Sequence, residues 1–188
     1  MEKEVRTSFL ETEFRANEDE EKLYLDGYFI RFNEETELYD DVFEAVSPDA
    51  VVESLASNDI RCLFNHDTGT VLGRTGNNTL TLTADEKGLF GSVEINKDDS
   101  EAMAIYSRVK RGDINACSFG FYPVNQTIEE RDNDETKITL NNIDLFEVSV
   151  VTFPAYPQTE VNARNQDILD HKKHRLDIRK QKLKERLK

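Results

Sequence analysis

The sequence has little of what marks a membrane, secreted or metal-binding protein. Its 188 residues include no tryptophan, two cysteines and four prolines. No apolar run approaches 18 residues, so no segment is expected to span a membrane, and the first four residues lack the apolar stretch of a secretory signal. Cys62 and Cys117 do not have zinc-site spacing. We therefore expect free thiols in a reducing compartment and no metal.

Basic residues are scarce except at the C-terminal end. Residues 165–188 hold nine Lys and Arg against four Asp and Glu, whereas residues 1–164 hold 15 against 34, a net charge of −19. Because DNA affinity depends on neutralising phosphates with Lys and Arg, the acidic body disfavours nucleic-acid binding. The basic end could bind an acidic partner or pair with its own body.

The chain divides into three predicted parts. Residues 1–22 are acidic with few apolar positions, and we expect a flexible arm or a weak edge element there. Residues 23–164 contain short stretches of alternating apolar and polar residues, which are typical of strands, and form the main domain. Residues 165–188 are expected to form an isolated helix, in which leucine recurs every seven residues.

The helix with the clearest signals is predicted over residues 98–111. Asp98 and Glu101 fit a capping box at its start. Apolar residues then recur at helical spacing, and Gly112 is suited to end the helix.

Three residues carry candidate chemistry. Ser118 lies in an apolar, aromatic stretch, His66 is the only histidine before residue 165, and Glu147 interrupts a run of apolar residues. A serine hydroxyl needs a base within reach, and the base needs an orienting partner. The three could form such a set. Each also has an ordinary structural explanation, as a strand serine, a turn histidine and a solvent-facing acid.

Strand alternation separates the two candidate nucleophiles. If residues 114–122 form a strand, Cys117 and Ser118 point to opposite faces, so both cannot face His66. Ser118 then shares its face with Ala116 and Gly120, two small neighbours expected to leave room for a substrate backbone.

The same alternation applies to the strand that contains Glu147. It puts Glu147 and Ser149 on one face, and Phe146 and Val148 on the other. An acid in such an apolar run either faces water or has a dedicated partner, and the imidazole of His66 is a suitable partner.

Seven short stretches share their order and spacing with a known family: residues 27–32, 63–67, 72–74, 88–89, 109–114, 117–121 and 145–155. Together they resemble the prohead proteases of tailed bacteriophages, the HK97-type capsid maturation proteases. The resemblance covers roughly residues 23–164.

The resemblance implies an α+β, mainly β fold. The expected core is a closed antiparallel β-barrel surrounded by a few helices, similar to herpesvirus assemblin, followed here by the C-terminal helical tail. It also implies a serine endopeptidase without a cofactor. Such an enzyme cuts the scaffolding part of the major capsid protein, and itself, inside the prohead in the host cytoplasm.

Matched residue by residue, the family's nucleophile is Ser118, its base is His66 and its third member is Glu147. Asp67 and Asp144 are nearby acids that could replace Glu147. The loop at residues 154–156 is a candidate for the oxyanion donors.

Three other functions stay open at this point. One is a cysteine protease that uses Cys117 with His66. Another is a catalytically idle capsid or scaffold protein with a protease-like barrel. The third is an acidic binding module with a coiled-coil tail. With any of these functions, the protein could also self-associate.

Overall fold

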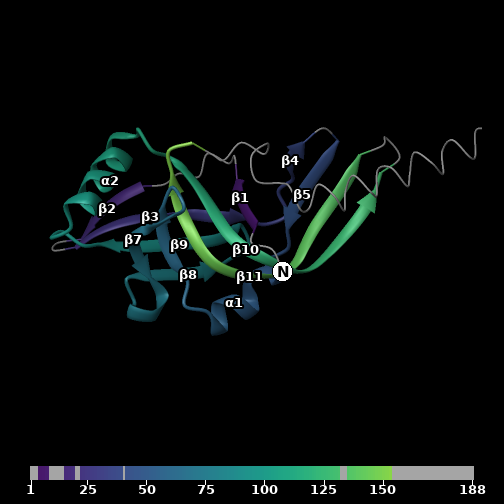
Figure 1. Ribbon diagram of the computed structural model, residues 1–188, viewed down its shortest axis with the longest axis horizontal. Coiled ribbons are helices and arrows are strands. Elements are labelled where there is room, and N and C mark those ends of the chain that lie inside the picture. The colour runs from purple at the N-terminus through teal and green to yellow at the C-terminus, as the bar shows by residue number, and fades with distance from the viewer. Residues whose placement is uncertain (1–3, 9–14, 20–21, 40, 132–134, 154–188) are drawn as a thin grey trace, which may run out of the picture. The chain divides into compact units, whose positions relative to one another are not determined.

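The computed structural model describes residues 4–8, 15–19, 22–39, 41–131 and 135–153 (Figure 1). These residues belong to one compact unit. The helix predicted over residues 165–188 and the candidate oxyanion loop at residues 154–156 lie outside the described residues.

The strands form two sheets. The larger sheet contains β1 (Glu4–Ser8), β4 (Thr36–Tyr39), β5 (Val42–Val46), β6 (Arg61–Phe64), β7 (Asp67–Arg74), β10 (Ala116–Glu130) and β11 (Thr136–Val151). The smaller sheet has the order β2 (Arg15–Asp19), β3 (Lys22–Arg31), β9 (Gly88–Ile95) and β8 (Leu80–Ala84).

The larger sheet is arranged around β11. This strand pairs antiparallel with β10 along its length, and Figure 1 shows the two as long green strands that run side by side. On its other edge, the first part of β11 pairs in parallel with β5 and the last part with β6. β1 adds to β10, and β7 adds to β6. The hairpin of β6 and β7 therefore lies beside the end of β11 that carries Glu147.

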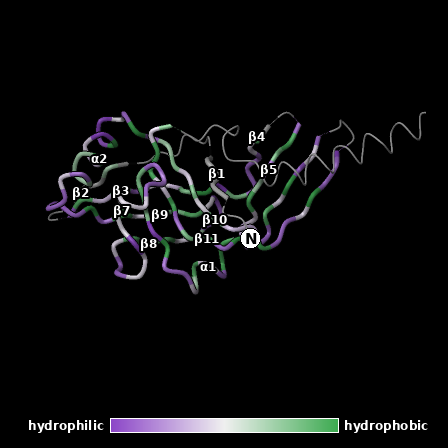
Figure 2. Tube along the Cα trace, in the orientation of Figure 1, coloured by the Kyte–Doolittle hydropathy of each residue, from purple (hydrophilic) through white to green (hydrophobic). Residues whose placement is uncertain are grey.

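Alternating burial explains why these stretches form strands around one core. In β9 the side chains of Leu89, Val93 and Ile95 are buried, and Phe90 and Ser92 between them are half-buried. Figure 2 shows the same repeated change between hydrophobic green and hydrophilic purple along the strands. Buried residues of both sheets belong to a single apolar cluster, so the hydrophobic effect holds the sheets together.

The predicted helix is confirmed as α2 (Ser100–Arg111), but it starts later than expected. Asp99 is the N-cap, because its carboxylate accepts hydrogen bonds from two backbone amides of the first turn. The amide of Asp98 instead donates to the side chain of Asn96. Gly112 ends the helix with a left-handed φ of 87°, a conformation that glycine adopts without steric cost.

The other helical segments are short: η1 (Pro48–Val51), α1 (Val52–Ser57) and η2 (Thr75–Asn77). Ser54 fastens α1 to β11, since its buried hydroxyl donates to the carbonyl of Ile143 and accepts from the amide of Leu145. Within the described residues, no helix has the length and apolar character needed to cross a membrane.

The described strands do not form the closed barrel that the resemblance implied. Barrel closure requires a continuous ladder of paired strands. Between the two sheets the described residues show only one isolated bridge, from Phe32 to Val46. Asn33 explains the interruption: its φ of 59° turns the chain away from the extended conformation directly after Phe32. The expectation of a closed barrel is therefore wrong for these residues, although the mainly β character is confirmed.

The N-terminal arm contains two edge strands. β1 pairs with β10 in the larger sheet and β2 pairs with β3 in the smaller one. Apart from Lys22, which begins β3, these two strands are the described parts of the predicted arm.

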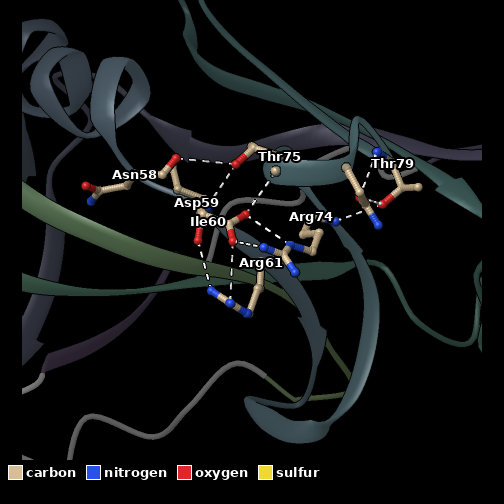
Figure 3. Close-up of polar contacts among 9 residues, drawn as sticks. Asn58, Asp59, Ile60, Arg61, Arg74, Thr75 and Thr79 are labelled. Atoms are coloured by element: carbon tan, nitrogen blue, oxygen red, sulfur yellow. Dashed lines mark hydrogen bonds and ion pairs between the residues drawn. The ribbon is translucent and has the colours of Figure 1, made fainter.

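A polar cluster fixes the open end of the hairpin of β6 and β7 (Figure 3). The carboxylate of Asp59 accepts from two nitrogens of the Arg74 guanidinium and from the amide of Gly76. The guanidinium of Arg61 lies 3.5 Å from the same carboxylate. Figure 3 shows Arg61 and Arg74 converging on Asp59. The cluster ties both strands together at the end opposite to His66.

We expect Asp59→Asn to lower the thermal midpoint at pH 7. The hydrogen bond from Arg74 holds the pKa of Asp59 below its usual value. A lowered folded-state pKa contributes stability above the unfolded pKa, about 3.9, and this contribution is lost as the pH falls through the folded pKa. The difference in midpoint between the variant and the wild type should therefore shrink as the pH is lowered toward 3. Circular dichroism melts at both pH values measure it.

Asp113→Asn is the matched control. Asp113 pairs with Arg111, its near neighbour in the chain, and connects no two strands. We expect a smaller decrease than for Asp59→Asn. Equal midpoints for Asp59→Asn and the wild type at pH 7 would show that the cluster does not stabilise the hairpin.

Candidate active site

His66 lies in the two-residue turn between β6 and β7. Asn65 and His66 have φ values of 50° and 60°, and the flanking residues Phe64 and Asp67 pair with each other. Two successive left-handed residues are typical of a type I′ hairpin turn, and Asn and His tolerate this conformation better than most residues. The amide of Asn65 donates to the carbonyl of Val150 at 2.9 Å, which holds the turn against the end of β11.

The imidazole of His66 contacts the carboxylate of Glu147. Nδ1 of His66 lies 2.7 Å from Oε1 of Glu147. Glu147 is only 2% exposed, and a buried carboxylate needs hydrogen-bond partners. The hydroxyl of Ser149 supplies a second partner, because it donates to Oε2 of Glu147 at 2.7 Å. It also accepts from the amide of His66 at 3.3 Å, so Ser149 ties the acid to the turn.

Gly120 provides the space that Glu147 occupies. The two residues pair across β10 and β11. A Cβ atom on Gly120 would overlap Oε1 of Glu147 and would lie 2.8 Å from Cζ of Phe146. The expectation that Gly120 leaves room for a substrate backbone is wrong, because the Glu147 side chain fills this room.

A β-bulge beside Gly120 changes the predicted faces of β11. Gly120 pairs with Glu147 but Phe121 pairs with Leu145, so Phe146 is an extra residue in the ladder. Strict alternation put Phe146 and Glu147 on opposite faces. Both side chains instead reach the position above Gly120, since a bulge re-aims the side chains next to it.

Ser118 lies on the same face as Glu147, two cross-strand pairs further along. It pairs with Ser149, and directly opposite residues have Cβ atoms about 4.5–5.5 Å apart. Ser118 is completely buried, at 0% exposure. The structure thus brings all three predicted site residues to one region of the sheet.

Both cysteines are buried in the apolar core, where a thiol is poorly placed to act as a nucleophile. Cys117 belongs to the apolar core together with Phe119 and Phe121, as alternation predicted. Cys62 is also buried in the core, and this burial raises the pKa of its thiol well above the ordinary value. A buried protonated thiol is unreactive.

The second ring nitrogen of His66 differs from the first in its surroundings. Nε2 is buried and has no hydrogen-bond partner among the described residues. Leaving such an atom unpaired costs about 1–3 kcal/mol, and an unpaired buried atom in a native protein needs an explanation. Because Nδ1 faces Glu147, Nε2 is the ring nitrogen that remains without a partner among the described residues.

The two alternative acids have other partners. Asp67 accepts from the amide of Gly69 at 2.9 Å, and Asp144 accepts from the side chain of Asn58 at 2.7 Å. Both are exposed. Of the three acids considered from the sequence, Glu147 is the one that contacts His66.

Ser149 is the site residue to which sequence reasoning gave no role. The sequence did contain one indication: Ser149 follows Glu147 by two residues, which puts both side chains on one face of a strand. Its role as a shared partner could not be inferred, because it depends on the parallel pairing of β6 with β11.

Among the described residues, no group of three or more His, Cys, Asp or Glu side chains is arranged to hold a metal ion.

A histidine–carboxylate pair with a serine on the same face of the sheet has the residue types of a serine hydrolase site, although Ser118 makes no hydrogen bond to Nε2 of His66. Comparison with known protein families then identifies the family of the chain. Residues 10–174 match the model of the caudovirus prohead serine proteases. The chain therefore belongs to this family of bacteriophage capsid maturation enzymes, and it is a serine protease.

The fold agrees with a solved structure. The chain is similar to the bacteriophage T4 capsid assembly protease, gp21, with a TM-score of 0.53 and 10% sequence identity, over 81% of this chain and 98% of that chain. At this identity the likeness shows a shared fold. A search of curated proteins finds no match.

We expect Gly120→Ala to destabilise the fold, by about 1–3 kcal/mol as is usual for overpacking. The added methyl group has to displace the Glu147 carboxylate or the Phe146 ring. Urea unfolding measures the change. Gly69→Ala is the control, since its Cβ would meet only the side chain of Asp67, at 3.2 Å. Equal stability of Gly120→Ala and wild type would contradict the close packing described here.

Proposed function

We propose that this protease cleaves peptide bonds with Ser118 as nucleophile, His66 as base and Glu147 as orienting acid. The observation that carries the proposal is the 2.7 Å contact between His66 Nδ1 and Glu147 Oε1, beside a serine on the same face of the sheet. The carboxylate fixes the proton of the imidazole on Nδ1 and leaves Nε2 to accept the serine proton.

The reaction proceeds through an acyl-enzyme. Ser118 Oγ attacks the scissile carbonyl carbon while His66 Nε2 takes the serine proton. The imidazolium, stabilised by Glu147, then gives this proton to the leaving amine. Water hydrolyses the ester in a second passage through the same steps.

The proposed substrates are the scaffolding part of the major capsid protein and the protease chain itself. Membership of the prohead protease family and the fold shared with a capsid assembly protease support this choice. The proposed place of action is the interior of the prohead in the host cytoplasm. The proposed division of the chain keeps residues 23–164 as the protease domain.

Ser118→Ala is expected to abolish processing and to leave the fold intact, because it removes one oxygen atom from a buried strand residue. Mass spectrometry of the chain, co-expressed with its capsid protein, measures cleavage of both proteins. Circular dichroism checks the fold.

Cys117→Ala is the matched control at the neighbouring position, and it should retain processing. Retained processing in Ser118→Ala, with loss in Cys117→Ala, would reverse the choice of nucleophile. Intact capsid protein and an intact chain in the wild-type sample would favour the non-catalytic assembly role instead.

Glu147→Gln is expected to slow cleavage by about 10²- to 10⁴-fold, less than the loss of Ser118 does, because the orienting acid contributes only part of the catalysis of such a set. Cleavage rates of the purified full-length chain on the capsid protein measure this. Asp67→Asn and Asp144→Asn should remain near the wild-type rate. A wild-type rate for Glu147→Gln, together with a slow Asp67→Asn or Asp144→Asn, would move the orienting role to that acid.

A further inference from the structure

The proposed function does not explain how a substrate reaches the Ser118 side chain. A protease needs the scissile carbonyl within about 3 Å of its nucleophile. Ser118 is completely buried, so an extended substrate cannot reach it in the observed conformation. Some part of the chain has to leave before the reaction.

On the side of Ser118 that faces β11, the neighbouring side chains belong to the candidate active site. Ser149 is the cross-strand neighbour of Ser118 on β11, and its hydroxyl is engaged with Glu147 and with the turn that carries His66. A substrate that displaced these groups would destroy the base and its acid. The opposite flank of β10 is the other edge along which an extended peptide can pair with the strand of Ser118.

The opposite flank of β10 is occupied by β1. The two strands are antiparallel, and their register places Thr7 opposite Ser118, with Arg6 opposite Phe119 and Val5 opposite Gly120. An extended peptide that adds to a sheet edge forms the same backbone ladder. β1 thus lies where an extended substrate would lie.

In the described part of the chain, β1 is held in the larger sheet by a single ladder. It is the terminal strand of the larger sheet and, among the described strands, pairs with β10 alone. β2, the next strand along the chain, belongs to the other sheet, where it pairs with β3. Removing β1 breaks one ladder and leaves every other described strand pair in place.

We propose that the edge of β10 next to Ser118 is the substrate-binding surface, and that β1 is its intramolecular occupant. The ligand is an extended polypeptide segment, bound through its main chain in antiparallel register with residues 117–121. β1 competes with it, so β1 lowers the fraction of molecules that can bind a substrate. This inference rests on the proposed role of Ser118.

The test measures how fast diisopropyl fluorophosphate, which modifies nucleophilic serines, labels Ser118 in the full-length chain. The variant is Arg6→Pro with Thr7→Pro. Successive backbone amides of a strand point to opposite edges, so one of the two prolines removes a hydrogen bond to β10 in either register. The control is Asn17→Pro with Glu18→Pro in β2, an edge strand of the other sheet. Peptide mass mapping identifies the labelled residue.

We expect labelling of Ser118 to be about tenfold faster in the β1 variant, because the reactive fraction of molecules scales the observed rate. The β2 control should stay within about twofold of the wild type. An excess of a synthetic peptide of residues 1–10 should slow labelling of the β1 variant toward the wild-type rate.

Equal labelling of Ser118 in the β1 variant and the wild type would overturn this inference and leave the proposed nucleophile standing. No labelling of Ser118 in any of the folded proteins would contradict the proposed function as well. If the double proline variant does not fold, Val5→Gly with Thr7→Gly weakens β1 more gently, with about threefold faster labelling expected. An unchanged rate in that folded variant would equally overturn the inference.

Discussion

The structure depends on the burial of one carboxylate. Glu147 lies in the apolar strand β11 at 2% exposure, where an unpaired charge would cost far more than a single hydrogen bond returns. Three features offset this cost: the His66 ring, the Ser149 hydroxyl and the missing side chain at Gly120. Each belongs to a different stretch of β6–β7, β10 or β11, so the acid fixes how these stretches meet.

The parallel pairing of β6 with the end of β11 makes this meeting possible. It brings the turn of Asn65 and His66 beside Glu147 from a position 81 residues earlier in the chain. The cluster around Asp59 holds the far end of the same hairpin (Figure 3). β10 then adds Ser118 from the other side. The strand of the proposed nucleophile and the strand of the proposed acid are direct neighbours, so the proposed residues reach one region of the sheet without a closed barrel.

Sequence reasoning predicted the strands that carry Ser118 and Glu147 but not how the side chains around them pack. Residue types and alternation placed Ser118 and Glu147 on strands and separated Ser118 from Cys117, because these depend on local periodicity. Alternation failed at Phe146, where a bulge that depends on the pairing with β10 shifts the register. It also could not assign Ser149 or the true occupant of the space at Gly120. The barrel was wrong because closure depends on long-range pairing, which Asn33 interrupts after a single bridge.

The most direct test of the account is nuclear magnetic resonance of the full-length chain with ¹⁵N-labelled histidine, assigned through a His66→Gln variant. A hydrogen bond from Nδ1–H of His66 to the Glu147 carboxylate predicts a strongly downfield Nδ1 proton resonance in the wild type. This resonance should vanish or move upfield in Glu147→Gln and persist in Asp67→Asn. A downfield resonance that is unchanged in Glu147→Gln, or that is absent from the folded wild type, would contradict the account.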